Sequence, residues 1–154
     1  MSSPSPYSEG FDEPTILSVR DAMTAQLITA TPETNLMEAV MVMNNHRIGS
    51  LVVIRAGKPV GIVTERDIMT KVVGRAVSAL DLRVADVMST QVTSIIEDGT
   101  LKDAARLMTR YGIRRLPVVN KQGDLVGIIS SMDIIREFPD LMSILSRPVR
   151  LAQL

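Results

Sequence analysis

Apolar and polar positions follow a pattern along the chain that occurs twice. In each copy a short apolar run precedes a segment with apolar residues at i, i+3, i+4 and i+7, which is typical of an amphipathic helix. Two further apolar runs then flank a glycine, Gly57 in the first copy and Gly123 in the second, which is typical of a β-hairpin. With a second short helix after each hairpin, the pattern predicts the order β-α-β-β-α, twice.

The predicted elements can be given residue ranges. The first strands are expected at residues 27–30 and 92–96, the hairpins at 51–63 and 116–129, and the short helices at 67–73 and 133–137. The long helices are expected from Leu36 and Leu101. Asn35 with Glu38, and Thr100 with Asp103, have the spacing of an N-cap and its partner at the start of those helices.

Identical residues support a duplicated unit. Residues 19–54 align with 84–119 at an offset of 65, and one extra residue in the second hairpin turn makes the offset 66 from there on. A three-stranded sheet covered on one face is too one-sided to be stable alone. We therefore predict an α/β (α+β) fold of two tandem repeats, packed sheet to sheet about a pseudo-two-fold axis, with two related clefts between them.

The expected organisation is a disordered tail at 1–14, the first repeat at 15–73, a linker at 74–83, the second repeat at 84–138 and a C-terminal tail at 139–154. The first residues are rich in Ser, Pro and acid, and they lack the basic and apolar regions of a signal peptide. No apolar run approaches the roughly 18 residues that a membrane span needs. A cytoplasmic protein is expected.

Composition excludes several function classes. The 17 basic and 17 acidic residues give no net charge and aromatics are 3% of the chain, which argues against nucleic-acid binding. There is no cysteine and one histidine, so we expect no thiolate nucleophile and no metal site. His46 is interpreted as a residue at a helix end and not as a catalytic base, and no enzymatic activity is expected.

Each repeat ends in Gly-x-x-Thr/Ser-x-x-Asp, at residues 61–67 and 127–133. One interpretation is structural, because a hydroxyl and a carboxylate at this spacing form a capping box. The other is functional, because a carboxylate at a strand–helix junction can accept both hydroxyls of a ribose, and the glycine allows close approach of a ligand. A carboxylate has enough acceptor sites to do both.

With these motifs in register, the chain resembles the cystathionine-β-synthase (CBS) domain family over about residues 16–138. Asp86-Val87-Met88 opens the second copy, and Arg114-Arg115-Leu116-Pro117-Val118-Val119 lies in its middle. The first copy departs mildly from the family pattern. It opens with Asp21-Ala22-Met23, and it has Ser50-Leu51-Val52-Val53 where the family often carries Leu-Pro-Val-Val.

The resemblance implies two clefts that bind AMP, ADP or ATP, with NAD and S-adenosylmethionine left open as ligands, and no other cofactor. It implies that Thr64 and Asp67 hold a ribose in one cleft and that Ser130 and Asp133 do so in the other. The remaining binding residues form a larger set. The base is expected near Ile113 in the Asp67 cleft and near Ile48 and Gly49 in the Asp133 cleft, with the backbone of Ile62 and Ile128 lining the two adenine pockets.

Arg114 and Arg115 align with Gly49 and Ser50, so the two clefts should differ in charge. Arginine suits bidentate phosphate contacts. We expect the pair to bind phosphate in the Asp133 cleft, with solvation at the surface as the alternative.

The resemblance implies a regulatory sensor that acts on an unidentified partner protein. A homodimer is expected through the helical faces, including Met37, Met41 and Val42 and the counterpart of this face in the second copy. The C-terminal tail is expected to extend the contact through Leu141, Met142, Ile144 and Leu145. The alternative is a structural interaction domain without a physiological ligand, in which the Thr/Ser-x-x-Asp pairs are only helix caps.

Overall fold

The computed structural model describes residues 17–25 and 27–138. The first repeat contains α1 (Val19–Ala22), β1 (Thr29–Ala30), α2 (Leu36–His46), β2 (Ser50–Arg55), β3 (Lys58–Thr64) and α3 (Glu65–Lys71). Two 3₁₀ turns, η1 (Val73–Arg75) and η2 (Ala79–Asp81), lead to the second repeat. That repeat contains α4 (Val84–Val87), β4 (Ile95–Ile96), α5 (Leu101–Tyr111), β5 (Arg115–Val119), β6 (Leu125–Ser130) and α6 (Ser131–Arg136). The predicted tail residues Leu141, Met142, Ile144 and Leu145 lie outside the described residues.

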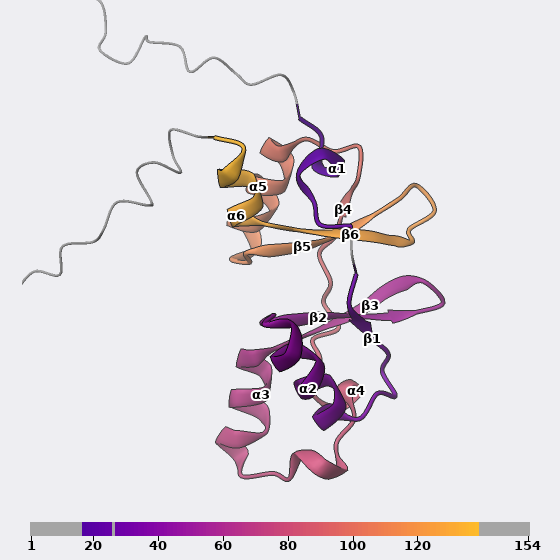
Figure 1. Ribbon diagram of the computed structural model, residues 1–154, viewed down its shortest axis with the longest axis vertical. Coiled ribbons are helices and arrows are strands. Elements are labelled where there is room, and N and C mark those ends of the chain that lie inside the picture. The colour runs from indigo at the N-terminus through magenta and orange to yellow at the C-terminus, as the bar shows by residue number, and fades with distance from the viewer. Residues whose placement is uncertain (1–16, 26, 139–154) are drawn as a thin grey trace, which may run out of the picture.

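Each repeat forms one three-stranded sheet, in the orders β1-β2-β3 and β4-β5-β6. The first two strands are parallel and the hairpin is antiparallel, with Val52 opposite Ile62 in one repeat and Pro117 opposite Ile128 in the other. The two sheets lie face to face, and the helices cover their outer faces (Figure 1). The predicted fold class is confirmed.

Side chains of β2 and β5 alternate between two environments. Leu51 and Val53 point toward the helices and join the first core with Leu36, and Leu116 and Val118 do the same in the second core. The intervening residues face the opposite sheet, since successive side chains of a strand point to opposite faces. Ser50 and Val52 therefore lie in the space between the repeats.

The short helices α1 and α4 are exchanged between the repeats. Val19 of α1 is fully buried in the core of the second repeat, and its N–H donates to the Gly99 carbonyl at 2.7 Å. Val84 of α4 is fully buried in the core of the first repeat, and its N–H donates to the Thr34 carbonyl at 2.9 Å. Figure 1 shows α1 above the upper sheet and α4 beside the lower one. Each repeat thus completes the core of the other.

The residues after α1 and α4 bond to the last strand of the other repeat, next to a glycine. Ile62 and Ser89 exchange two backbone hydrogen bonds of 3.0 and 2.8 Å. A Cβ on Gly61 would lie 2.6 Å from the Met88 sulfur and 3.1 Å from the Ser89 carbonyl oxygen. Gly127 has the same relation to Met23 and Thr24. These glycines make room for the exchanged chain, which corrects their interpretation as points of ligand approach.

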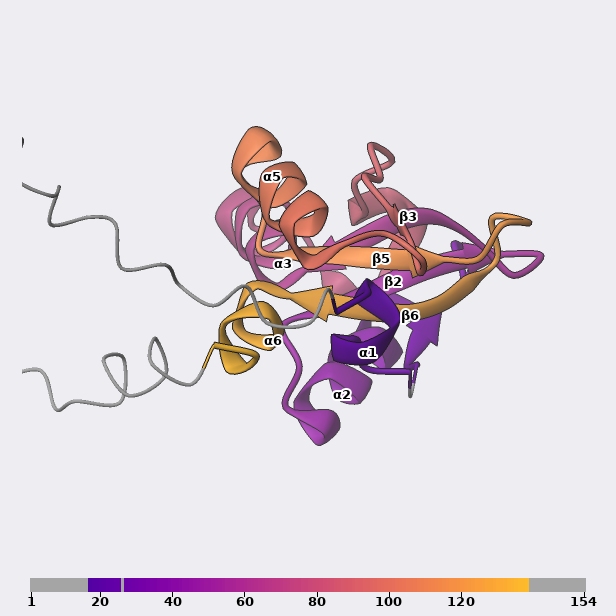
Figure 2. The ribbon, with the colours of Figure 1, turned by 90° about the horizontal axis from the view of Figure 1, so that it is seen from above.

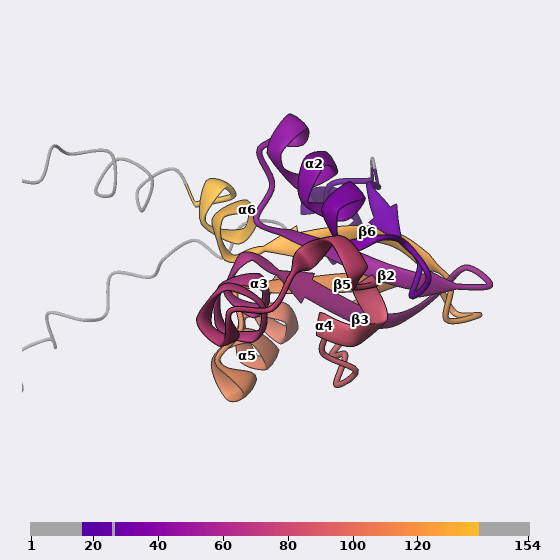
Figure 3. The same ribbon diagram turned by 90° about the horizontal axis from the view of Figure 1, so that it is seen from below.

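The two hairpin turns lie side by side at one edge of the molecule (Figure 2 and Figure 3). Gly57 and Gly123 adopt φ values of 77° and 84°, in the left-handed region that favours glycine. The Leu125 N–H donates to the Gly57 carbonyl at 2.9 Å, and the Lys58 ammonium lies 3.3 Å from an Asp124 carboxylate oxygen. The turns therefore tie the repeats together away from the cores.

Helices α3 and α6 begin at Glu65 and Ser131, two residues earlier than expected. Thr64 and Ser130 are their N-caps, so the helices must begin at the next residue.

Among the residues that the structure describes, no helix has the length and apolar character needed to cross a membrane.

Candidate functional site

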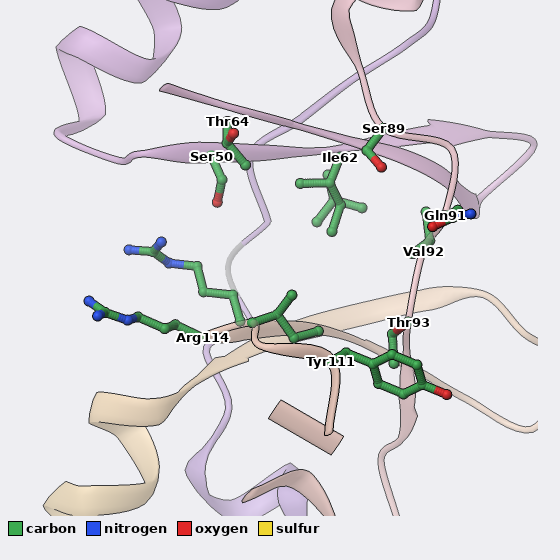
Figure 4. A pocket seen from close by; sticks show the side chains of 12 residues that line it. Ser50, Ile62, Thr64, Ser89, Gln91, Val92, Thr93, Tyr111 and Arg114 are labelled. Atoms are coloured by element: carbon green, nitrogen blue, oxygen red, sulfur yellow. The ribbon is translucent and has the colours of Figure 1, made fainter. Parts of the chain in front are cut away.

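A cleft of about 540 Å³ lies between the two repeats. It is lined by both of them and by the segment that follows α4. The lining residues are Ser50, Val52, Ile62, Thr64, Ser89, Gln91, Val92, Thr93, Tyr111, Ile113, Arg114 and Arg115. Ser50, Thr64 and Arg114 lie at one end, whereas Ser89, Gln91 and Tyr111 lie toward the other (Figure 4).

Thr64 and Asp67 form a complete capping box at the start of α3. The Thr64 backbone N–H and hydroxyl donate to one Asp67 carboxylate oxygen at 3.0 and 2.9 Å, and the Asp67 N–H donates to the hydroxyl at 3.1 Å. The other Asp67 oxygen lies 3.2 Å from the Lys71 ammonium. Thr64 lines the cleft, and the Asp67 carboxylate is hydrogen-bonded to Thr64 without lining the cleft itself.

Ser130 and Asp133 repeat this arrangement at the start of α6. The Ser130 N–H donates to Asp133 at 2.8 Å, and the Asp133 N–H donates to the Ser130 hydroxyl at 3.1 Å. The second Asp133 oxygen accepts from the Arg136 guanidinium at 3.2 Å. The structural interpretation of both motifs as capping boxes is confirmed, and ribose binding by the same carboxylates stays a prediction.

The predicted base-binding residues are placed as follows. Ile113 and the side chain of Ile62 line the cleft, but the backbone N–H and C=O of Ile62 are both bonded to Ser89. The backbone of Ile128 is bonded to Thr24 in the same way. The backbone of these two isoleucines therefore has its hydrogen bonds within the fold, and Ile62 meets the cleft through its side chain.

Ile48 and Gly49 precede β2 on the other side of the pseudo-two-fold axis. Ile48 is half-buried and packs against the first core. The Gly49 carbonyl accepts from the Glu65 N–H at 3.0 Å, and a Cβ on Gly49 would lie 3.2 Å from a Glu65 carboxylate oxygen. Their role in a second, Asp133-side cleft remains a prediction.

Arg114 and Arg115 are expected from the sequence to bind phosphate in the Asp133 cleft, and that role stays a prediction. Both line the cleft that contains Thr64. Ile113, which directly precedes Arg114 in the chain, lines the same cleft. Arg115 also pairs with Ser130 across β5 and β6, so it lies beside the N-cap residue of α6.

Several lining residues were not predicted, among them Ser50, Gln91 and Tyr111. Two signals were available in the sequence. Ser50 and Val52 alternate with the core residues Leu51 and Val53, and Gln91 is identical to Gln26 in the repeat alignment. His46, the residue equivalent to Tyr111, is exposed at the end of α2.

The cleft has the features of a site for an amphipathic anion. Arg114 and Arg115 supply positive charge, five hydroxyl groups and one amide supply hydrogen bonds, and isoleucine, valine and tyrosine side chains supply apolar surface. No aspartate or glutamate lines it. In the described part of the chain no three His, Cys, Asp or Glu residues are grouped as metal ligands would be.

Comparisons with known proteins agree with this architecture. The CBS domain family model matches residues 19–74 and 84–140. The CBS domain-containing protein YhcV of Bacillus subtilis is 37% identical over 117 residues, which cover 76% of this chain and 82% of that protein.

Two solved structures contain adenosine compounds. The CBS domain pair of protein MJ0100, in complex with 5-methylthioadenosine and S-adenosyl-L-methionine, is 31% identical with a TM-score of 0.72, over 82% of this chain and 98% of that one. CBSX2 in complex with AMP is 26% identical with a TM-score of 0.71, over 81% and 98% of the two chains. With both repeats matched by the family model, the chain belongs to the CBS domain family.

Proposed function

We propose that this CBS pair is a regulatory sensor that binds an adenosine nucleotide in the cleft between its repeats and has no catalytic activity of its own. The observation that carries the proposal is a cleft built from both repeats, with hydroxyl groups, an arginine pair and apolar walls. Its volume of about 540 Å³ falls in the range of small-molecule sites. AMP, ADP, ATP, NAD and S-adenosylmethionine are the candidate ligands, and the cytoplasm is the proposed location.

The site spans two repeats, so a ligand can couple to their relative position. A ligand that binds one arrangement of the repeats more tightly shifts the population toward it. A partner protein that contacts both repeats would detect this shift. The regulatory output therefore depends on a ligand that touches Thr64 in one repeat and Ile113 in the other.

The binding test is a calorimetric titration of the purified protein with each candidate ligand. Asp67→Asn and Asp133→Asn should each weaken binding in their own cleft by at least about tenfold, because a ribose hydroxyl loses a charged acceptor. Asp103→Asn is the matched control. Asp103 forms the same capping box with Thr100 at the start of α5, but Thr100, unlike Thr64, does not line the cleft, so this variant should lose a similar amount of stability and keep its affinity.

Two outcomes contradict the proposal at different levels. If Asp67→Asn and Asp133→Asn bind nucleotide as well as Asp103→Asn does, the carboxylates are helix caps only. If no candidate ligand binds or raises the melting temperature of the wild-type protein, the result supports the alternative of a structural interaction domain.

A homodimer through the first repeat is part of the proposal. Met41, Met69 and Val73 are 59, 64 and 70% exposed and lie on or just after the helices α2 and α3. Between those helices is a groove of about 200 Å³, lined by Met43 and Ile68 among others. The second repeat has Arg106 where the first has Met41, so its corresponding helix carries a charge there. The more apolar helix face of the first repeat favours contact between two first repeats about a two-fold axis.

Sedimentation velocity tests the dimer. Met41→Lys combined with Met69→Lys should convert the dimer to a monomer, because the contact would bury like charges against each other. Met132→Lys, on the exposed part of α6, should leave the dimer intact. A monomeric wild-type protein at micromolar concentration would overturn this part of the proposal.

A further inference from the structure

The Thr64 cleft has one cationic end. Both arginines that line it, Arg114 and Arg115, are exposed to solvent. Within residues 17–25 and 27–138 neither guanidinium forms a salt bridge, whereas Arg20, Arg55 and Arg136 all do. The other lining residues are neutral. A cleft with two cations and no carboxylate has a positive potential that attracts anions and repels cations.

The backbone of both arginines is fixed by secondary structure. The Arg114 carbonyl accepts from the Ser131 N–H at 2.9 Å, which ties the residue to the start of α6. Arg115 begins β5 and is paired with Ser130 of β6. The guanidinium groups therefore extend into the cleft from rigid supports, which lowers the entropy cost of binding a ligand. Guanidinium groups fit phosphate oxygens in a bidentate geometry.

The opposite part of the cleft is suited to a base. Ile62, Val92 and Ile113 provide apolar surface, and Tyr111 provides an aromatic ring. The Arg110 guanidinium lies 5.6 Å from the centre of that ring, within the range of a cation–π contact. In Figure 4 Tyr111 lies away from the end where Arg114 meets Ser50 and Thr64. A nucleotide can therefore place its base toward Tyr111 and its phosphates toward the arginines.

From this polarity we infer that the Thr64 cleft selects adenosine ligands by their phosphate charge and rejects S-adenosylmethionine. The inference rests on the proposed function and narrows its ligand class. Affinity should rise from adenosine to AMP to ADP, because each phosphate adds charge that the arginines can pair. S-adenosylmethionine carries a sulfonium cation at the position of the first phosphate, so it should be repelled.

The test compares adenosine, AMP, ADP and S-adenosylmethionine by calorimetry on the wild-type protein. ADP should bind at least about tenfold more tightly than adenosine, and raised salt should weaken ADP binding without changing adenosine binding. Arg114→Gln and Arg115→Gln should each reduce the preference for ADP over adenosine by about fivefold to tenfold. Arg106→Gln is the control, since Arg106 is an exposed arginine of α5 outside the cleft and should leave the preference unchanged.

The possible results separate this inference from the proposed function. If adenosine, AMP and ADP bind equally, or if S-adenosylmethionine binds as tightly as ADP, charge selection is wrong and nucleotide sensing stands. If the preference for ADP survives in both arginine variants, the arginines do not carry it and the inference is again wrong. If none of these four compounds binds, and ATP and NAD do not bind either, the proposed function itself fails.

Discussion

Leu51 and Leu116 occupy equivalent places in the two repeats and are both almost fully buried, whereas the residues just before them, Ser50 and Arg115, differ in size and charge. The same contrast appears on the long helices, where Ala39 and Ala104 are both buried and Met41 is replaced by Arg106. The duplicated positions hold the cores together. The unequal positions face the cleft or the outer surface, so the difference between the repeats lies where ligands and partners bind.

The exchange of α1 and α4 gives the largest expected effect. Val84→Asp would bury an unpaired carboxylate in the first core and should lower the free energy of unfolding by about 4 kcal/mol or more. Val19→Asp should cost less, because α1 is bonded to the second repeat through the Glu97 and Gly99 carbonyls and can detach while the two sheets stay paired. Hydrogen exchange checks this difference. Val84→Asp should expose amides throughout the sheets, and Val19→Asp only those around α1 and Gly99. An equal loss of amide protection throughout the protein in both variants would contradict this expected difference.

The glycines next to the exchanged segments give the next largest effect. Gly61→Ala and Gly127→Ala should each destabilise the protein by about 1–3 kcal/mol, because the new methyl group would press on a methionine and on a backbone carbonyl. Denaturant unfolding measures the change. Gly49→Ala is the control, since the atoms that its methyl would meet first belong to the flexible Glu65 side chain. A neutral Gly61→Ala would show that the repeats can move apart at little cost.

The hairpin turns provide a smaller effect. Lys58 and Asp124 are equivalent in the repeat alignment, carry opposite charges and form an exposed ion pair. Lys58→Asp should cost about 0.5–1 kcal/mol by placing two carboxylates together. The double variant Lys58→Asp/Asp124→Lys should recover most of that loss in thermal unfolding. If the double variant does not recover thermal stability, the hydrogen bond from Lys58 to the Gln122 carbonyl contributes more to stability than the Lys58–Asp124 ion pair does.

The smallest effect is expected at Asp21. The hydroxyl and the N–H of Ser18 donate to its carboxylate and hold the pKa of Asp21 below its usual value. A lowered pKa contributes stability above the unfolded value of about 3.9, and that stability is lost as the pH falls through the folded value. Asp21→Asn should therefore lower the melting temperature slightly at pH 7 and match the wild type in strong acid. A constant difference at all pH values would exclude the ionised carboxylate as the cause.

The sequence predicted the repeated order of elements and the capping boxes because both depend on local spacing. Thr100 with Asp103 and Ser130 with Asp133 form the predicted caps, and Asn35 caps α2 by accepting from the Met37 N–H. The nucleotide role of these residues is not decided by their placement. Ile113 was predicted to lie in the Thr64 cleft, and the structure places it there.

The exchange of α1 and α4 could not be predicted in the same way. Val19 and Val84 occupy equivalent positions in the repeat alignment, and only long-range packing decides which core receives each of them. The cleft that Arg114 lines depends on how the two sheets face each other. The residue pattern within one repeat carries no information about that arrangement. Gly61 and Gly127 were noticed as a pair, but the neighbours that require glycine are Met88 and Met23, which come from the opposite repeat.

The exchanged helices also limit how this protein can be divided. A fragment ending before Val84 would lack the residues that seal its interior, and a fragment beginning there would lack Val19. Each half by itself would leave part of its core exposed. Two fragments mixed in solution could restore each other, and one fragment alone could do so only by exchanging its first helix with an identical copy. An insertion between the two repeats would have to leave α1 packed in the second core and α4 packed in the first.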